Sequence, residues 1–406
     1  MSLALREDPA AALGSAATIR ERCRNIAAAA TAGDSHHFRI DRTRLDHTAA
    51  MVAAVTRRRY PDFDVPCHSR WRHFETGGLD RKAELDRALD GRSAADRARA
   101  HIDLTVASVL LDAGAGAAWS FVEAESGQRF TRSEGLAVAS FRAFMRGAFS
   151  ARQDDPLRVD ASALATIDAE TLASLFQAGT ANPLLGLDGR AALLRRLGSA
   201  LTTQRDAFGD TARPGALFDT LTRTRREISA STLLEALLDG LGPIWHRGSA
   251  LDGAPLGDVW RHPHAGGSGP TAGWVPFHKL SQWLAYSLFE PFQWAGITVT
   301  EREQLTALPE YRNGGLLLDA GVLHLVDAAD GARTWNVGDE LVVEWRALTV
   351  ALIDELAPRV RAHLAAPALP LACILEGGTW AAGRELAAEL RAGKPPLSID
   401  SDGTVF

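Results

Sequence analysis

The sequence predicts a mainly α-helical protein with one small β element near its C-terminus. Apolar residues recur at helical spacing through most of the chain, and many of these segments are rich in alanine. Glycine or proline stands where such segments end, as at Gly33 and Pro61. Strand signals are confined to residues 322–326 and 397–399, which could pair with each other.

The expected helices follow one another along the whole chain. The first covers residues 15–32, the second covers 45–59, and an irregular segment at 62–78 comes next. The other expected helices cover residues 80–90, 93–111, 133–149, 161–178, 189–207, 231–238, 277–292, 314–318, 339–364 and 378–391, with Ser133 and Asp168 as N-caps and a break at Pro358.

Polar breaks and one long loop suggest how the chain is organised. Residues 1–35 are expected to form an N-terminal helical segment and residues 36–406 a single large helical domain. The break at 206–216 is the best candidate for a hinge between two lobes. The stretch 247–273 is rich in glycine and proline, and a loop of this length is usually functional or mobile.

The composition is that of an ordinary globular protein. The 406 residues are 46% apolar and carry a formal net charge of -6, which gives no electrostatic reason to expect nucleic-acid binding. The three cysteines are far apart in sequence and form neither a disulfide framework nor a zinc motif, which favours a reducing cytosol. No apolar run approaches the roughly 20 residues that span a bilayer. We therefore expect a cytoplasmic protein without membrane or nucleic-acid partners.

Aromatic residues and histidines gather in one part of the chain. Five of the ten tryptophans and four of the twelve histidines lie between residues 245 and 294. Apolar walls with a few placed polar groups are what a pocket for a small polar ligand requires. Plain core packing is the alternative for any one of these tryptophans, but their concentration favours a pocket.

The irregular segment 62–78 contains the first candidate site. Arg70 and Arg72 offer planar donors suited to a phosphate or carboxylate, and His73 and Glu75 could act on such a group. The alternation of residue types also predicts a strand with the two arginines on one face. The alternative is a surface Arg–Glu pair beside a glycine turn.

His262 and His264 form an H-x-H pattern that can be half of a metal site. The other half would have to come from His246, Asp258, His278 or Cys67, and no spacing requires this. We therefore favour a structural histidine pair or a lid loop, and predict no metal.

Two further segments carry charges that suit a ligand. Lys279 follows His278 in the first turn of a predicted helix, where both could hold an anion; the alternative is an amphipathic helix with a basic first turn. In the triplet 310–312, burial would make Glu310 a general acid, whereas pairing with Arg312 would keep it ionised and able to stabilise a cation. The alternative is a local salt bridge at a helix start.

The segment 376–384, EGGTWAAGR, has glycines inside a helical stretch, which indicates close packing or a ligand at the backbone. Asp402-Gly403 is an ordinary hairpin signal.

The chain resembles the uracil-catabolism protein four family. The shared motifs are WRHFETGG, GDVWRHP, VPFHKLSQWL, LPEYRNGGLLLDAGVL, EGGTWAAGR and SDGTVF, spread from position 67 to the C-terminus. This resemblance implies a role in a pyrimidine breakdown route. In that route the uracil ring is opened while attached to ribose phosphate, which leaves a ribosylurea-type intermediate.

Residues 277–323 are more weakly similar to the queuosine-nucleotide N-glycosidase family, which implies a helical, glycosylase-like bundle. That family has a lysine–x–glutamine helix followed by an aspartate-tyrosine-arginine triplet. Here Lys279 and Gln282 take comparable places, and residues 310–312 replace the triplet with glutamate at its first position.

These likenesses and residues together predict an enzyme that hydrolyses the N-ribosidic bond of a 5′-phosphorylated ribosylurea. Such cleavage passes through an oxocarbenium-like cation and needs a carboxylate and a proton donor. Glu310 would stabilise the cation, and Glu75 or His73 would protonate the leaving group or position water. Arg72, Lys279 and Arg312 would hold the phosphate, Trp274, Phe277 and Tyr311 would form the walls, and Arg70, His278, Gln282 and Asn313 complete the predicted substrate-binding set.

No cofactor is predicted, and the expected partner is a small nucleotide-derived substrate. One alternative is a metal-dependent hydrolase of the C–N bond in the urea group, with His262, His264 and His278 as ligands. Another is a non-catalytic subunit of the same pathway.

Overall fold

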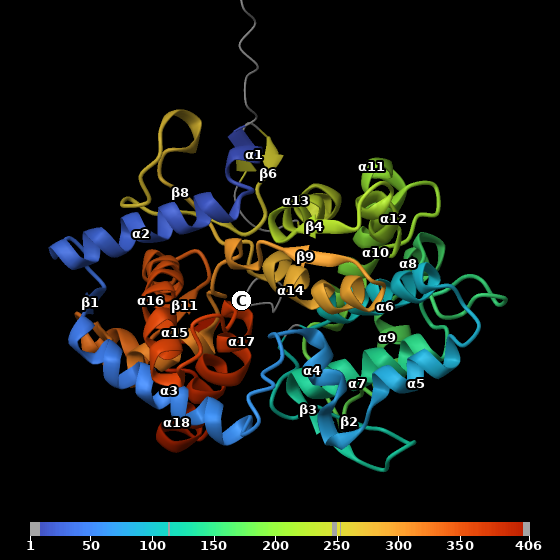
Figure 1. Ribbon diagram of the computed structural model, residues 1–406, viewed down its shortest axis with the longest axis horizontal. Coiled ribbons are helices and arrows are strands. Elements are labelled where there is room, and N and C mark those ends of the chain that lie inside the picture. The colour runs from blue at the N-terminus through green and yellow to red at the C-terminus, as the bar shows by residue number, and fades with distance from the viewer. Residues whose placement is uncertain (1–8, 113, 246–249, 252, 401–406) are drawn as a thin grey trace, which may run out of the picture.

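A computed structural model describes residues 9–112, 114–245, 250–251 and 253–400 and is mainly α-helical, which confirms the predicted fold class (Figure 1). The α-helices are α1 (Pro9–Ala12), α2 (Ala16–Ala32), α3 (Leu45–Arg59), α4 (Arg70–Phe74), α5 (Arg81–Ala88), α6 (Ala94–Leu110), α7 (Arg132–Met145), α8 (Ala161–Thr166), α9 (Ala169–Leu175), α10 (Leu187–Thr203), α11 (Arg205–Phe208), α12 (Ala216–Thr222), α13 (Ala230–Leu241), α14 (Lys279–Trp294), α15 (Tyr311–Asp319), α16 (Glu340–Leu364), α17 (Leu371–Ile374) and α18 (Trp380–Arg391). The 3-10 helices are η1 (Arg42–Arg44), η2 (Thr76–Gly78), η3 (Gly242–Ile244), η4 (Gly269–Thr271), η5 (Arg302–Gln304) and η6 (Ala328–Ala332), and η7 (Leu375–Thr379) is a π-helical turn.

The strands form separate two-stranded sheets, not one C-terminal element. The antiparallel pairs are β1 (Phe38–Ile40) with β10 (Leu323–Leu325), β2 (Ser120–Val122) with β3 (Arg129–Thr131), β5 (Ala250–Leu251) with β6 (Ala254–Pro255), and β7 (Val259–Arg261) with β8 (Trp274–Pro276). The parallel pairs are β4 (Glu227–Ser229) with β9 (Thr298–Thr300), and β11 (Thr334–Asn336) with β12 (Ser398–Asp400).

Both predicted strand segments are strands, but the suggested pairing between them is wrong. Strand β10 pairs with β1, so that Phe38 lies opposite Leu325, and β12 pairs with β11. An alternation of residue types with a period of two identifies a strand but not its partner strand. The packing of distant helices decides which strands pair.

Helix positions agree with the predictions, and several boundaries differ. The predicted helix 161–178 is two helices, because Asp168 accepts a hydrogen bond from Thr171 N at 2.8 Å and starts α9 anew, as an N-cap should. Ser133 is not an N-cap, since α7 begins at Arg132. Pro358 does not break α16, which packs against α2 and α3 and stays helical to Leu364.

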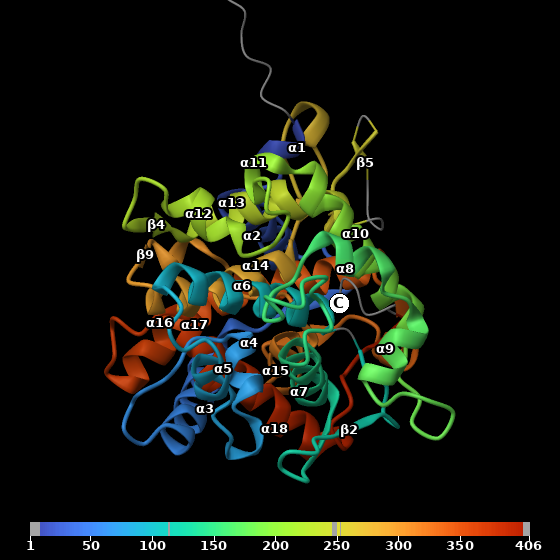
Figure 2. The same cartoon turned by 90° about the vertical axis from the view of Figure 1, so that its right-hand side faces the viewer.

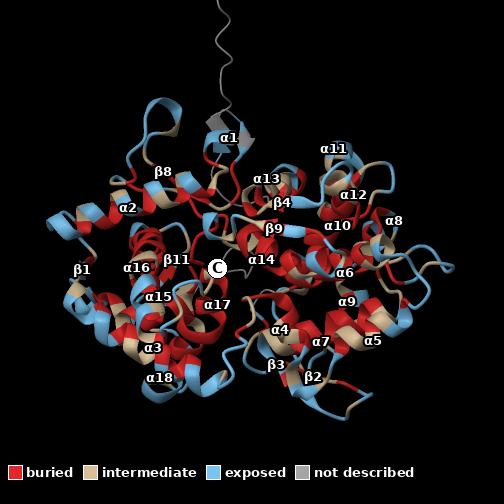
Figure 3. Cartoon of the chain, viewed as in Figure 1, coloured by how far each residue is buried: buried red, intermediate tan, exposed pale blue. Residues whose placement is uncertain are grey.

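The helices gather in two groups on either side of α14 (Figure 1). One group combines α2 and α3 with α15–α18, and the other contains α4–α10. In the view turned by 90°, α11–α13 again lie above α14 (Figure 2). Helices α14 and α16 are buried along most of their length (Figure 3), so they form the centre of the molecule.

The predicted hinge segment 206–216 contains the end of α11 and a turn before α12. In this turn Arg213 donates to Asp103 on α6 at 2.5 Å, and Gly215 N donates to the same carboxylate at 2.6 Å. The division into lobes stays a prediction. His246 and the Asp402-Gly403 turn lie outside the described residues.

Candidate active site

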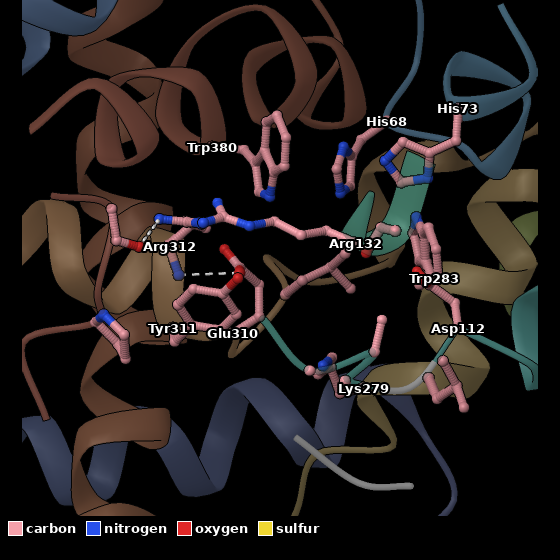
Figure 4. Close-up of a pocket in the computed structure, with 18 of the residues that line it drawn as sticks. His68, His73, Asp112, Arg132, Lys279, Trp283, Glu310, Tyr311, Arg312 and Trp380 are labelled. Carbon is pink, nitrogen blue, oxygen red and sulfur yellow. Dashed lines mark hydrogen bonds between the residues drawn. The ribbon is translucent and has the colours of Figure 1, made fainter. Parts of the chain in front are cut away.

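A cavity of about 500 Å³ lies between the two groups of helices (Figure 4). Its size falls within the range of small-molecule pockets. Charged, aromatic and small residues line it: His68, His73, Asp112, Gly114, Ala115, Gly116, Ala117, Arg132, Ser133, Lys279, Leu280, Trp283, Leu308, Glu310, Tyr311, Arg312, Trp380, Gly393 and Pro395. The cavity therefore draws on segments from almost the whole length of the chain.

Glu310 is the N-cap of α15 and faces the cavity. Its carboxylate accepts hydrogen bonds from Arg312 N at 2.9 Å and from Asn313 N at 2.6 Å, and the residue is only 8% exposed. Burial raises the pKa of Glu310, while the two N–H donors and the charge of Lys279 act in the opposite direction. The helix thus holds a buried carboxylate in one fixed orientation.

Basic side chains from three helices surround this carboxylate. Lys279 begins α14, Arg132 begins α7, and Arg312 lies in the first turn of α15. Burial lowers the pKa of Lys279, and the charge of Glu310 opposes this change. Arg312 donates to Gly393 O at 3.3 Å and lies over the Tyr311 ring, 4.7 Å from its centroid. This combination suits an anionic ligand.

The N-terminus of α14 is not itself open to an anion. Asp258 accepts a hydrogen bond from Lys279 N at 3.0 Å and pairs with Arg346 at 2.7 Å. A protein carboxylate therefore already occupies the helix end at which we predicted an anion site. Of the two predicted anion-binding side chains, Lys279 reaches the cavity and His278 does not.

Arg70 lies fully buried behind the cavity wall. It pairs with Asp112 at 3.1 Å and donates to Ser108 Oγ at 2.7 Å and to His73 Nδ1 at 3.1 Å. Burial away from water and the charge of Arg70 lower the pKa of His73 to about 4. His73 is therefore neutral at physiological pH, and because its Nδ1 accepts from Arg70, its Nε2 carries the hydrogen.

His68 and Glu376 form a second polar pair at the cavity. His68 Nδ1 lies 2.7 Å from Glu376 Oε2. Burial acts to raise the pKa of Glu376, but the hydrogen bond to His68 together with the charges of His68, His73 and Arg59 outweighs it, and the pKa lies below its usual range. The ionised carboxylate fixes the hydrogen on Nδ1 and leaves Nε2 as the nitrogen able to exchange a proton. Glu376 lies on the π-helical turn η7, a feature often found at functional sites.

Two indole rings hold the His68 imidazole between them. The ring centroid of Trp283 lies 6.3 Å from that of His68, and the centroid of Trp380 lies at 6.1 Å. Trp283 also contacts the edge of His73 at 5.9 Å. In Figure 4, His68, His73 and Trp380 lie along one edge of the cavity and Lys279 lies toward the opposite edge.

Five of the predicted site residues meet at this cavity: His73, Lys279, Glu310, Tyr311 and Arg312. Arg70 supports His73 from behind. Arg72 and Glu75 do not line the cavity, because Arg72 pairs with Glu75 at 2.9 Å and with Glu290 at 2.6 Å. The predicted strand at 70–75 is instead helix α4, whose N-cap Ser69 accepts from Trp71 N, so residues that alternate in sequence do not share one face.

The other predicted wall residues lie elsewhere in the structure. Trp274 packs in a small separate cluster beneath Arg261, and Phe277 is fully buried under Arg346. The His278 ring faces Leu13 O at 3.0 Å.

Gln282 and Asn313 support the fold around the site. The Gln282 side chain binds Thr306 through both its amide nitrogen and its oxygen, at 2.8 Å and 2.9 Å. Asn313 donates its side-chain amide to Leu308 O at 3.1 Å. Both therefore position backbone next to Glu310 without lining the cavity.

The sequence predictions missed several residues of the site: His68, Asp112, Arg132, Trp283, Trp380 and Glu376. Some of them lie in segments that the sequence analysis singled out, such as 376–384, but only the fold brings their side chains together at one cavity. One sequence signal for Glu376 existed, namely the adjacent glycine pair Gly377-Gly378, which permits the close approach of η7 to α3.

The proposed metal donors are not grouped as a metal site. His262 accepts a hydrogen bond from His264 N through Nδ1, and His278 binds the Leu13 carbonyl at a distinct place. Among the described residues, no three His, Cys, Asp or Glu side chains are arranged as ligands of one ion. Across the same part of the chain, no helix combines the length and the apolar character that crossing a bilayer requires.

Comparison with known proteins covers nearly the whole chain. The family described as "Protein of unknown function (DUF1688)" matches residues 12–406. The chain is 38% identical to Uracil catabolism protein 4 of Lachancea kluyveri, over 92% of this chain and 93% of that protein. It is also 38% identical to Protein urg3 of Schizosaccharomyces pombe, over 96% of each chain. This extent of matching confirms the family resemblance, and the chain belongs to the DUF1688 family and to that of Uracil catabolism protein 4.

Proposed function

We propose that the protein acts in uracil breakdown as a hydrolase of the N-ribosidic bond in a 5′-phosphorylated ribosylurea, releasing urea and ribose 5-phosphate. The name of the relative Uracil catabolism protein 4 supports the pathway. The observation that carries the reaction type is the cavity itself. In it, a buried carboxylate fixed by two backbone N–H groups stands among cationic side chains and imidazoles.

The proposed chemistry assigns a separate task to each kind of group. As the bond between C1 of ribose and the urea nitrogen lengthens, positive charge develops on the sugar, and the Glu310 carboxylate stabilises it. His68 transfers a proton through Nε2, either to the leaving urea or from the attacking water, and the Glu376 carboxylate stabilises its charged form. His73 is neutral and donates a hydrogen bond from Nε2 to the bound substrate.

Binding and orientation fall to the basic and aromatic residues. Arg132, Arg312 and Lys279 neutralise the phosphate, while Trp283 and Tyr311 provide flat apolar surfaces for the ribose and the planar urea. Glu75 and Arg72, which pair with each other away from the cavity, have no direct part in this proposal.

The first experiment identifies the products. The purified protein is incubated with ribosylurea 5′-phosphate, and urea, ribose 5-phosphate and ammonia are measured, with and without a chelator. Urea and ribose 5-phosphate in equal amounts support the proposal. Ammonia that disappears with the chelator supports the metal-dependent ureido hydrolase, and binding without any product supports the non-catalytic subunit.

The second experiment tests the carboxylate. Glu310→Gln should lower kcat about 10²–10³-fold, because a neutral amide stabilises the developing cation less, while the affinity for ribose 5-phosphate stays close to that of the parent protein. Asp168→Asn is the matched control, since it neutralises another helix N-cap away from the cavity. An unchanged kcat in Glu310→Gln would remove Glu310 from the mechanism.

A further inference from the structure

Two of the three cysteines meet beside the candidate active site, although their sequence spacing gives no sign of it. The Sγ atoms of Cys67 and Cys373 lie 3.9 Å apart. Cys67 is half-buried and lies just before the WRHFETGG motif, and Cys373 is buried on α17. The third cysteine, Cys23, is fully buried in α2.

The two thiols have unequal chemistry. The hydrogen bond from Cys373 lowers the pKa of Cys67, and the charges of Arg302 and Arg72 act in the same direction while burial and Glu290 oppose it. The same bond and burial raise the pKa of Cys373. A thiolate is the nucleophile in thiol chemistry, so Cys67 is the more reactive partner.

The two cysteines are built into the segments that hold the imidazole–carboxylate pair. Cys67 directly precedes His68, whose backbone N–H donates to Ala372 O at 2.9 Å. Cys373 is followed three residues later by Glu376 on η7. The thiol contact and the hydrogen bond between His68 and Glu376 therefore join the same two segments at neighbouring points.

We propose that Cys67 and Cys373 form a peroxide-sensitive modification site, whose disulfide displaces His68 relative to Glu376. The Cys67 thiolate attacks hydrogen peroxide: an S–O bond forms, the O–O bond breaks, and hydroxide leaves and takes up the thiol proton as water. The Cys373 sulfur then attacks the Cys67 sulfenic acid: an S–S bond forms, the S–O bond breaks, and a second water leaves with the Cys373 proton. Two thiols are oxidised by two electrons in all, and one peroxide is reduced to two waters.

The displacement follows from distances. Sulfurs 3.9 Å apart must approach to about 2.05 Å to bond, and in this proposal the two side chains turn toward each other and draw their segments with them. The π-helical turn η7 begins two residues after Cys373, and it is the part of this segment that departs from regular helical hydrogen bonding. A shift there moves Glu376 away from its 2.7 Å contact with His68.

The test compares cysteine variants of the full chain after treatment with hydrogen peroxide. Peptide mapping should find a Cys67–Cys373 disulfide that dithiothreitol reverses. Cys373→Ser should instead hold a Cys67 sulfenic acid that a dimedone probe captures, and Cys67→Ser should form neither product. Cys23→Ser is the matched control and should form the disulfide as the parent protein does.

The effect on the site rests on the proposed function and is measured separately. In the oxidised parent protein, urea release should fall about a hundredfold, the scale of a lost acid–base group, and return on reduction. In Cys67→Ser it should not respond to peroxide. Failure to find the disulfide, or a disulfide without change in urea release, overturns the inference. If the reduced protein releases no urea at all, the proposed function fails. Peptide mapping then still shows whether the Cys67–Cys373 disulfide forms, and the affinity for ribose 5-phosphate shows whether the disulfide changes the cavity.

Discussion

Glu310 combines two tasks in one side chain. As an N-cap it satisfies two backbone donors at the start of α15, and as a cavity residue it presents negative charge to whatever binds there. The two tasks reinforce each other, because the helix N-terminus favours the ionised form that cation stabilisation needs. His68 obtains its orientation in a comparable way, from Glu376 and from the rings on either side of it.

This arrangement makes Glu376 a positioning residue whose removal should change kcat more than KM. In Glu376→Gln the His68 imidazole loses its ionised partner, and we expect kcat to fall about a hundredfold while KM for ribosylurea 5′-phosphate changes little. Steady-state kinetics measure both constants. Glu385→Gln, on exposed α18 surface and paired with Arg58, is the control. A large rise in KM with unchanged kcat would contradict a role through His68.

At the scale of elements, the contact between α15 and α18 sets the position of Glu310 and Arg312. Gly383 makes this contact possible: a Cβ atom there would lie 2.1 Å from Arg312 O, which is backbone and cannot yield. The glycine inside a helix is therefore explained by close packing, one of the two readings that its sequence permitted.

Gly383→Ala should accordingly destabilise the protein by about 1–3 kcal/mol and lower urea release, because it forces α15 away from α18. Gly189→Ala is the matched control, since Gly189 lies exposed in α10 with open space around it, and the alanine should stabilise its helix by up to about 1 kcal/mol. Urea denaturation measures both changes. Equal changes in the free energy of unfolding of the two variants would show that the α15–α18 contact is not tight.

A buried charge cluster joins α5, α7 and the end of β2. Glu123 is fully buried and accepts from Arg81 at 2.7 Å and from Arg142 at 2.7 Å. Burial acts to raise the pKa of Glu123, but hydrogen bonds from Arg81, Ser126 and Arg142 outweigh it and lower the pKa to about 2. Because the unfolded chain binds this proton near pH 4.3, the cluster stabilises the fold fully above that pH and progressively less as the pH falls toward 2.

Replacing Glu123 by Gln should therefore cost about 3 kcal/mol or more near neutral pH, since it leaves buried arginines without their counter-charge. The free energy of unfolding, measured at pH 6 and pH 3, should fall less between these values in Glu123→Gln than in the parent protein. Asp154→Asn, which breaks an exposed pair with Arg152, is the control and should change the pH dependence far less than Glu123→Gln does, because solvent screens an exposed pair. An identical pH dependence in the parent protein and in Glu123→Gln would show that Glu123 is not the source of the stability lost at low pH.

Local signals predicted most helices, and tertiary packing decided the rest. Caps and periodicity identified α2, α3 and the N-cap of α9, because those signals lie within a few neighbouring residues. They failed at α4, where an alternating pattern resembled a strand, and at Pro358, where packing kept α16 helical. Of the site, the Glu310 triplet, Lys279 and His73 could be found, because charged and titratable side chains stand out beside aromatic and apolar residues.

The remaining site residues could not be found by local reasoning. His68 and Glu376 acquire their meaning from each other, and nothing in either segment indicates a contact across the length of the chain. The same holds for Cys67 and Cys373. Trp274 shows the converse error, because a tryptophan in the aromatic-rich region proved to belong to a separate small cluster.

At the scale of the whole molecule, the N-terminal helices are part of the same core as the C-terminal ones. Helix α2 packs against α16 and β8, and α3 packs against α16 and η7. The first and last long helices of the chain thus pack together, and residues from both groups of helices and from α14 line the cavity. The cavity can keep its shape only if this packing holds.

This packing predicts that residues 1–35 are not an independent segment. Ile26 on α2 is 1% exposed in the main core, so Ile26→Ala should cost about 2–5 kcal/mol through lost burial and the cavity left behind. The near-ultraviolet signal of the tryptophans and the far-ultraviolet helical signal should move together to a lower unfolding midpoint, because one core unfolds as a unit. Arg24→Ala is the control, since Arg24 is exposed on the same helix and its pair with Asp354 is a surface contact worth little. An N-terminal helix that melts first, while the remaining signal keeps its midpoint, would instead establish residues 1–35 as a separate segment.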